Sequence, residues 1–199
     1  LLPEPLCHPH RPAAGIIGKK HVGPGSVYPF DFAYTEENSS VLQVGRNITR
    51  IKLLVRKFFQ THKAEAAERR RVRGEGISSN PKEEEEERPF FLYVAFHDTH
   101  RCGHSQPQYG AFCEKFGNGE TGMGIGLVLQ ELRDAGYEND TLIIYSSDNG
   151  IPFPNGRTNL YQSGTAEPML VSSPEHRERW GDTSQAYVSL LGEKQLYPT

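Results

Sequence analysis

Three apolar segments of the sequence are each followed, within a few residues, by side chains of types that bind cations or anions. Carboxylate and carboxamide oxygens are the ligands that hard cations such as calcium and magnesium prefer. Lysine and histidine instead offer positive charge and hydrogen-bond donors to a tetrahedral anion. Together these residue types predict metal-assisted hydrolysis of a sulfate or phosphate derivative. The residues are, in chain order, Lys19 and His21, then His97, Asp98 and His100, and finally Asp148 and Asn149.

Each of these motifs also has a simpler explanation when it is taken alone. Asp148-Asn149-Gly150 is a turn sequence, because all three residue types favour turns. His97 and His100 could be ordinary polar residues at the end of a strand. Their joint placement after three apolar segments favours the functional interpretation, because sites in open α/β sheets form where strand ends converge.

A further candidate is Arg157, which follows a loop rich in proline and glycine just beyond Asp148. Such a loop is conformationally restricted, so it could direct the guanidinium group back to the bound anion. The simpler alternative is an exposed loop arginine, which the sequence by itself favours.

The elements expected to position these side chains are the apolar segments 14–17, 90–96 and 141–145. Their continuous rather than alternating apolar character predicts strands that are buried on both faces, as in parallel sheets. The carboxyl ends of parallel strands lie at one edge of a sheet. We therefore expect the three polar groups to meet at that edge.

Two further segments have the apolar periodicity of helices that pack against a sheet. Basic residues surround the apolar stripe of the first. After the second, Gly136 stands where a glycine cap belongs, and the third strand follows. Helix-and-strand units of this kind predict an α/β sandwich. The two stripes consist of Ile51, Leu54, Val55, Phe58 and Phe59, and of Ile125, Val128, Leu129 and Leu132.

Residues 61–87 combine an arginine cluster at 69–71 with a run of glutamates at 83–87 and few apolar side chains. This composition cannot offset the entropy cost of ordering, so we expect a disordered insertion. A heparin-binding patch at 69–73 is the less favoured alternative. The adjacent glutamates and the net charge of -3 argue against a nucleic-acid binder. No apolar run approaches the ~20 residues that span a bilayer.

Cysteines and glycosylation sequons bear on the cellular compartment. Ten residues separate Cys102 and Cys113, which suits a small disulfide-closed loop, although unpaired thiols of a cytosolic protein are the alternative. Cys7 has no partner motif. Three Asn-x-Ser/Thr triplets, together with a plausible disulfide, favour the secretory pathway. They begin at Asn38, Asn47 and Asn139.

At these positions the chain resembles the sulfatase family. Residues 18–23, with the sequence GKKHVG, are similar to the second sulfatase signature, and residues 147–150, SDNG, to a later metal-binding strand end. Longer segments, 15–60, 88–124 and 125–191, resemble members that act on N-sulfated glucosamine. The resemblance implies part of an alkaline-phosphatase-like α/β sandwich with a mostly parallel central sheet.

The resemblance also implies a role for each candidate residue. Asp148 and Asn149 would be two of the calcium ligands. Lys19 and His100 would hold the sulfate oxygens or assist the leaving group. His21 would contact a hydrated formylglycine, whose attack on sulfur begins the family's reaction. The remaining implied assignments are Arg157, which would orient groups around the formylglycine, a disulfide between Cys102 and Cys113, and glycans on Asn38, Asn47 and Asn139.

The biological setting follows from the same resemblance. The expected reaction removes N-linked sulfate from the terminal glucosamine of a heparan sulfate-derived oligosaccharide. The expected compartment is the lysosome, reached through the secretory pathway. The resemblance further implies a homodimer.

The chain also departs from the family pattern. The Cys-x-Pro-Ser-Arg motif, whose cysteine becomes formylglycine, does not occur, and a pair of calcium-binding aspartates is missing. Thr99 replaces a proline. Residues 1–14 and 192–199 lose the resemblance, 61–87 is extra, and a family stretch is missing near 124–125. Without a signal peptide or initiating Met, the chain is expected to be incomplete, unstable and inactive alone; the alternative is an inactive fragment or glycan-binding pseudoenzyme.

Overall fold

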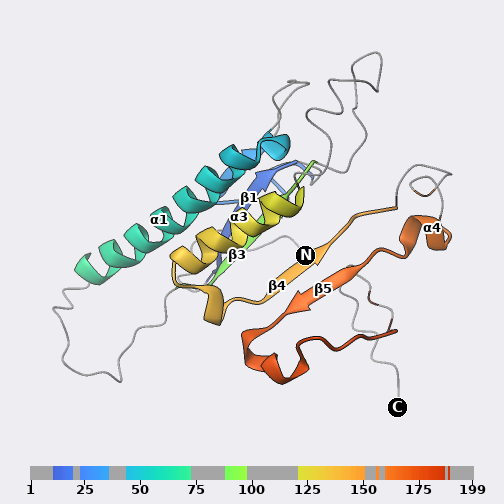
Figure 1. Ribbon diagram of the computed structural model, residues 1–199. Helices are drawn as coiled ribbons and strands as arrows, with labels where there is room; N and C mark the ends of the chain where they lie inside the picture. The colour runs from blue at the N-terminus through green and yellow to red at the C-terminus, as the bar shows by residue number, and fades with distance from the viewer. Residues whose placement is uncertain are drawn as a thin grey trace. The chain divides into compact units, whose positions relative to one another are not determined.

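A computed structural model describes residues 11–19, 23–35, 44–72, 88–97, 121–150, 156, 160–186 and 188 of the chain. The chain divides into two compact units, Leu1–Asn139 and Asp140–Thr199, each of which has its own architecture (Figure 1). Among the described helices, none is both long and apolar enough to cross a membrane.

The first unit is built on a parallel sheet with the strand order β2-β1-β3. Strand β1 (Ala13–Gly18) lies in the centre and pairs in parallel with both β2 (Phe32–Thr35) and β3 (Phe90–Ala95). The central strand is the most buried, as its continuous apolar sequence predicts. The expected strands at 14–17 and 90–96 are therefore confirmed, and they are neighbours in one sheet.

Helix α1 (Ile48–Val72) packs its apolar stripe on this sheet, and α3 (Thr121–Asp134) lies beside it (Figure 1). The predicted stripe residues Ile51, Val55 and Phe58 are buried. A Cβ added at Gly15 would lie 2.8 Å from both Phe58 and Leu92, so the small residue lets α1 approach the strand closely.

A partly buried ion pair joins the two helices. The Arg56 guanidinium donates to both carboxylate oxygens of Glu131, at 2.7 and 2.8 Å, and the Lys52 ammonium lies 3.8 Å away. The hydrogen bonds that Arg56 donates to Glu131, and secondarily the negative charge of Glu131, raise the pKa of Arg56. Because Glu131 is only 3% exposed, this carboxylate depends on its basic partners for compensation.

Both helices have the terminal signals that the sequence contains. The Asn47 side-chain oxygen accepts the Arg50 N–H at 2.9 Å, the geometry of an N-cap. At the end of α3, Gly136 has φ +82°, and the Tyr137 N–H donates to the Leu132 carbonyl at 3.1 Å. This is the Schellman arrangement, so the glycine cap predicted at Gly136 is confirmed.

The prediction of a disordered loop from Thr61 is wrong for residues 61–72, which continue α1. His62 and Ala66 are buried and extend the stripe of Phe58 by successive turns. The His62 ring donates from Nε2 to the Arg88 carbonyl at 2.8 Å, and its Nδ1 lies 3.2 Å from the Tyr137 hydroxyl. Residues 73–87 lie outside the described part of the chain.

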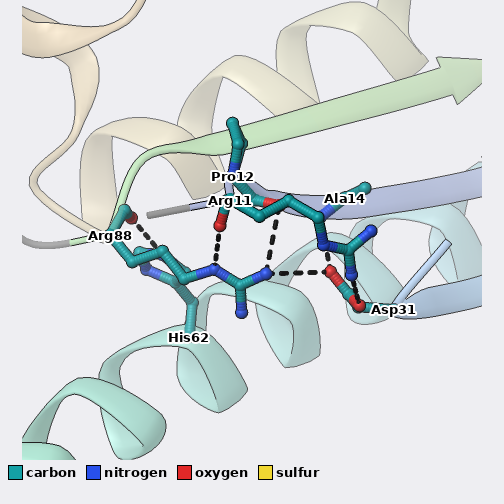
Figure 2. Close-up of polar contacts among 6 residues, drawn as sticks. All are labelled: Arg11, Pro12, Ala14, Asp31, His62 and Arg88. Carbon is teal, nitrogen blue, oxygen red and sulfur yellow. Dashed lines mark hydrogen bonds and ion pairs between the residues drawn. The ribbon is translucent and has the colours of Figure 1, made fainter. Parts of the chain in front are cut away.

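A polar cluster ties together the starts of β1 and β3 (Figure 2). Asp31 accepts the Ala14 N–H at 3.0 Å and pairs with Arg11 and Arg88. The Arg88 guanidinium also donates to the carbonyl oxygens of Arg11 and Pro12. These partners lie at the beginnings of the strands. The cluster therefore stabilises the amino-terminal end of the sheet, and Lys19 lies at the carboxyl-terminal end.

The second unit contains a two-stranded antiparallel sheet of β4 (Ile143–Ser146) and β5 (Met169–Ser172). A short helix, α4 (Gln162–Thr165), precedes β5, and a 3-10 segment, η4 (Pro174–Arg179), follows it. Two further 3-10 segments of the first unit are η1 (Val44–Arg46), before α1, and η2 (Glu138–Asp140), which reaches the boundary between the units.

Burial on both faces was expected for all three apolar strands, and it holds only for β1. On β3, Phe91 and Tyr93 are 58% and 42% exposed and alternate with covered residues. Ile144 and Tyr145 on β4 are also exposed. The physical reason is that β1 has a neighbouring strand on each side, whereas β3 and β4 are edge strands of the described sheets.

Candidate functional site

Lys19 lies at the carboxyl end of β1, where the sequence places it. Its backbone N–H donates to the Ala95 carbonyl at 2.9 Å, which extends the ladder between β1 and β3 by one residue. Gly18 precedes it with φ +103°, and a Cβ there would lie 2.0 Å from the Ala95 oxygen. Only glycine fits this close approach, so Gly18 fixes the direction in which the chain leaves the strand.

His97 lies at the adjacent end of β3 and is 8% exposed. Its N–H donates to the Gly45 carbonyl at 2.9 Å, which joins the strand end to the segment that opens α1. Gly124 on α3 lies close to Phe96 and Ile48 in the same region. The structure therefore brings Lys19 and His97 to the same edge of the parallel sheet, as predicted.

Asp148, Asn149 and Gly150 form an arm that leaves β4 and is braced by the chain around α4. The Gly150 N–H donates to the Gly164 carbonyl at 3.2 Å, and a Cβ on Gly150 would lie 2.0 Å from the Ser163 oxygen. The Ser147 hydroxyl donates to the Asn149 carbonyl at 3.1 Å. These contacts fix the backbone of the arm, so it is more than a solvated turn.

The donor atoms of the arm suit a hard cation. The Asn149 side-chain amide donates from Nδ2 to the Gly150 carbonyl at 3.0 Å, and its Oδ1 is the side-chain atom that can act as an acceptor or a cation ligand. Asp148 is exposed and presents a carboxylate. Oxygen ligands of these two types fit calcium, which takes six to eight of them. Among the described residues, no group of three or more His, Cys, Asp or Glu side chains is placed to hold a metal ion.

Sequence reasoning missed the residues that brace this arm. Ser163 and Gly164 contact Gly150, and the Glu167 carboxylate lies 3.1 Å from the position of a Cβ on Gly150. The Ser146 hydroxyl also reaches across to the Pro168 carbonyl at 3.1 Å. The pairing of β4 with β5 brings these segments together, and nothing in the spacing of the apolar residues reveals that pairing.

Several predicted residues lie outside the described part of the chain. Lys19 and His97 belong to the first unit, and Asp148 and Asn149 belong to the second. Of the sequons, Asn47 and Asn139 are exposed, which suits glycan attachment. The predicted residues outside the description are His21, Asp98, His100, Arg157, Cys102, Cys113 and Asn38.

Comparison with known proteins identifies the family. The model of the family described as Sulfatase matches residues 75–199. Human N-sulphoglucosamine sulphohydrolase is 58% identical over 93% of this chain and 40% of its own length. Human arylsulfatase A is 30% identical over 46% of this chain and 21% of its own length. An ulvan-active sulfatase of Formosa agariphila is 32% identical over 38% of this chain and 14% of its own length.

The chain thus spans about two fifths, or less, of the length of these relatives. The family match covers more than half of the chain and includes the arm at Asp148 and Asn149, whose oxygen donors suit a metal. The parallel sheet with helices packed on it agrees with the α/β fold expected for the family. The chain therefore belongs to the sulfatase family.

Proposed function

We propose that the chain is part of a sulfamidase, a hydrolase that removes N-linked sulfate from the terminal glucosamine of a heparan sulfate-derived oligosaccharide. The observation that carries the proposal is the 58% identity, over 93% of the chain, to human N-sulphoglucosamine sulphohydrolase. The oxygen donors on the arm at Asp148 and Asn149 support it, because a bound cation can stabilise the charge that develops as a sulfate loses its leaving group.

Some residues of this chain would bind the calcium ion, and others would bind the sulfate group. Asp148 and Asn149 would hold calcium through their side-chain oxygens, which are of the types that calcium prefers. Lys19 and His100 would bind the sulfate oxygens or protonate the departing amine. Lys19 suits this role because it stands at the edge of the sheet beside His97. His21 and Arg157 would orient the nucleophile and the groups around it.

The covalent chemistry of the family comes from formylglycine, which supplies the nucleophile for attack on sulfur. Its Cys-x-Pro-Ser-Arg motif does not occur in the 199 residues. The proposal therefore assigns anion binding and part of the calcium site to this chain, and the nucleophile to a segment outside it. A lysosomal location, glycans at the three sequons, a Cys102–Cys113 disulfide and a homodimer belong to the same proposal.

The experiment compares two aspartate variants in a protein that joins this chain to a segment carrying the Cys-x-Pro-Ser-Arg motif. We expect Asp148→Ala to lower sulfate release from N-sulfoglucosamine by about 100-fold or more, because the reaction loses metal stabilisation of its developing charge. The matched control is Asp140→Ala, since Asp140 is also exposed and lies before β4.

The control is expected to keep the parent rate. Equal rates for the Asp148 and Asp140 variants would show that the arm holds no catalytic cation. If the joined protein without substitutions released sulfate neither from N-sulfoglucosamine nor from any other sulfated sugar, a glycan-binding pseudoenzyme would be favoured.

A further inference from the structure

Residues 173–182 form a compact loop after β5 that presents the aromatic side chain of Trp180. The loop closes on itself, because the Trp180 N–H donates to the Arg177 carbonyl at 3.1 Å and the Asp182 N–H to the Arg179 carbonyl at 3.1 Å. Gly181 follows with φ +93°, a conformation that favours glycine and turns the chain away. We call these residues the Trp180 loop.

The indole ring is both fixed and exposed. Its Nε1–H donates to the Ser173 carbonyl at 3.1 Å, which restrains rotation of the ring. The side chain is nevertheless 57% exposed. A tryptophan that is held in place yet open to solvent has lost rotamer entropy before any ligand arrives, so stacking on it costs less.

A guanidinium group lies over the same ring. The Arg177 Cζ is 5.5 Å from the indole centroid, within the range of a cation–π contact. Two other polar contacts lie within the loop: Arg179 pairs with Asp182, and the His176 Nδ1 lies beside the Glu178 carboxylate, each at 3.4 Å. The loop therefore combines an aromatic surface with an arginine beside it.

This combination matches one chemical class of ligand. The apolar face of a sugar ring stacks on an indole, and a guanidinium group binds the oxygens of a sulfate through two parallel hydrogen bonds. We infer that the Trp180 loop is a binding site for a sulfated sugar unit, with Trp180 as the stacking surface and Arg177 as the sulfate ligand. The choice of a sulfated sugar rests on the proposed function.

The site is separate from the arm at Asp148. Ser146, which leads into the arm, pairs with Met169, whereas Ile143 at the other end of β4 pairs with Ser172, which leads into the Trp180 loop. The two ends are about 10 Å apart along the strands alone. The Trp180 loop would therefore contact a unit of a longer chain, away from the residue that loses its sulfate.

The test uses the fluorescence of Trp180 in the full 199-residue chain, because it is the single tryptophan of the sequence. An N-sulfated heparan oligosaccharide is titrated against an unsulfated oligosaccharide of the same length. We expect a saturable change of emission with the sulfated ligand, and Arg177→Ala to weaken its binding about tenfold, as loss of a charged hydrogen-bond partner predicts.

Arg179→Ala is the matched control, since it removes an arginine that pairs with Asp182 and does not lie over the ring. It should bind within about twofold of the parent chain. Arg177→Lys, which keeps the charge but not the planar fork, should give an intermediate affinity and guards against misfolding of the alanine variant.

An unchanged emission, equal affinities for the two ligands, or equal effects of the Arg177 and Arg179 variants would overturn the inference. Sulfate release is measured separately in the protein that carries the nucleophile segment. Release without a fluorescence response would refute the Trp180 loop site and leave the proposed function intact. A fluorescence response without sulfate release would contradict the proposed function and leave the Trp180 loop as a binding site.

Discussion

At the scale of single residues, two glycines decide the geometry of the candidate site. Gly18 turns the chain out of β1 towards Lys19, and Gly150 lets the arm after β4 lie against the Ser163 carbonyl. Both glycines lie in motifs that the sequence analysis singles out because of the polar side chains beside them, Lys19 and Asp148. The glycines matter because a Cβ at either position would enter the space of a carbonyl oxygen.

Gly150→Ala is expected to lower the free energy of unfolding by about 1–3 kcal/mol, as other overpacked substitutions do. The added Cβ would lie 2.0 Å from a backbone oxygen, so the arm must move as a whole. Chemical denaturation of the full chain measures the change.

Gly126→Ala is the control on α3. Nothing lies within 4 Å of its Cβ position, so the substitution should raise the free energy of unfolding by up to ~1 kcal/mol through helix propensity. An equal loss of stability in both variants would argue against the close contact at Gly150.

The candidate residues were predictable to different degrees. Lys19, Asp148 and Asn149 follow apolar strands, and a strand end is visible as the point where apolar residues stop. Ser163 and Gly164, which brace the arm, are ordinary loop residues in the sequence. Their role depends on the register of β4 with β5, and short strands leave little in the sequence to specify that register.

At the scale of elements, the apolar pattern located β1, β3, β4 and the helices α1 and α3, but it missed β2 and β5 and the full extent of α1. The stripe of α1 continues beyond Phe59 through His62 and Ala66, where the sequence turns polar. The helix persists because His62 finds partners in Arg88 and Tyr137, which are distant in the sequence. Tertiary contacts of this kind cannot be read from local composition.

The ion pair between α1 and α3 tests how the helices are held. Glu131→Gln should lower Tm by about 5 °C, because the amide cannot accept both hydrogen bonds from Arg56 and leaves a buried polar group poorly matched. Because its pKa is raised, Arg56 stays protonated until the pH rises through that pKa, so its charge is available to Glu131 at neutral and moderately alkaline pH.

Glu68→Gln provides the matched control, since Glu68 forms an exposed pair with Arg71 on the same helix. Its removal should leave Tm unchanged within error, as exposed ion pairs contribute little. Thermal unfolding followed by circular dichroism compares the two variants, and a larger effect at Glu68 would contradict the described packing.

At the scale of the whole molecule, the chain holds two parts of a sulfatase. The first unit carries Lys19 on a parallel sheet, and the second carries the arm at Asp148 and Asn149. Family membership was predictable from the sequence because the motifs GKKHVG and SDNG, and the long segments around them, resemble the sulfatase family. The split into two units was not, because it depends on which strands pair.

Sulfate release from N-sulfoglucosamine tests the central claim most directly. The purified 199-residue chain should release none, because the Cys-x-Pro-Ser-Arg motif that provides the family's nucleophile is absent from it. Joining the chain to a segment with that motif, in its formylglycine form, should produce release that depends on Asp148. Release by the 199-residue chain alone, or none from the joined protein, would contradict the account.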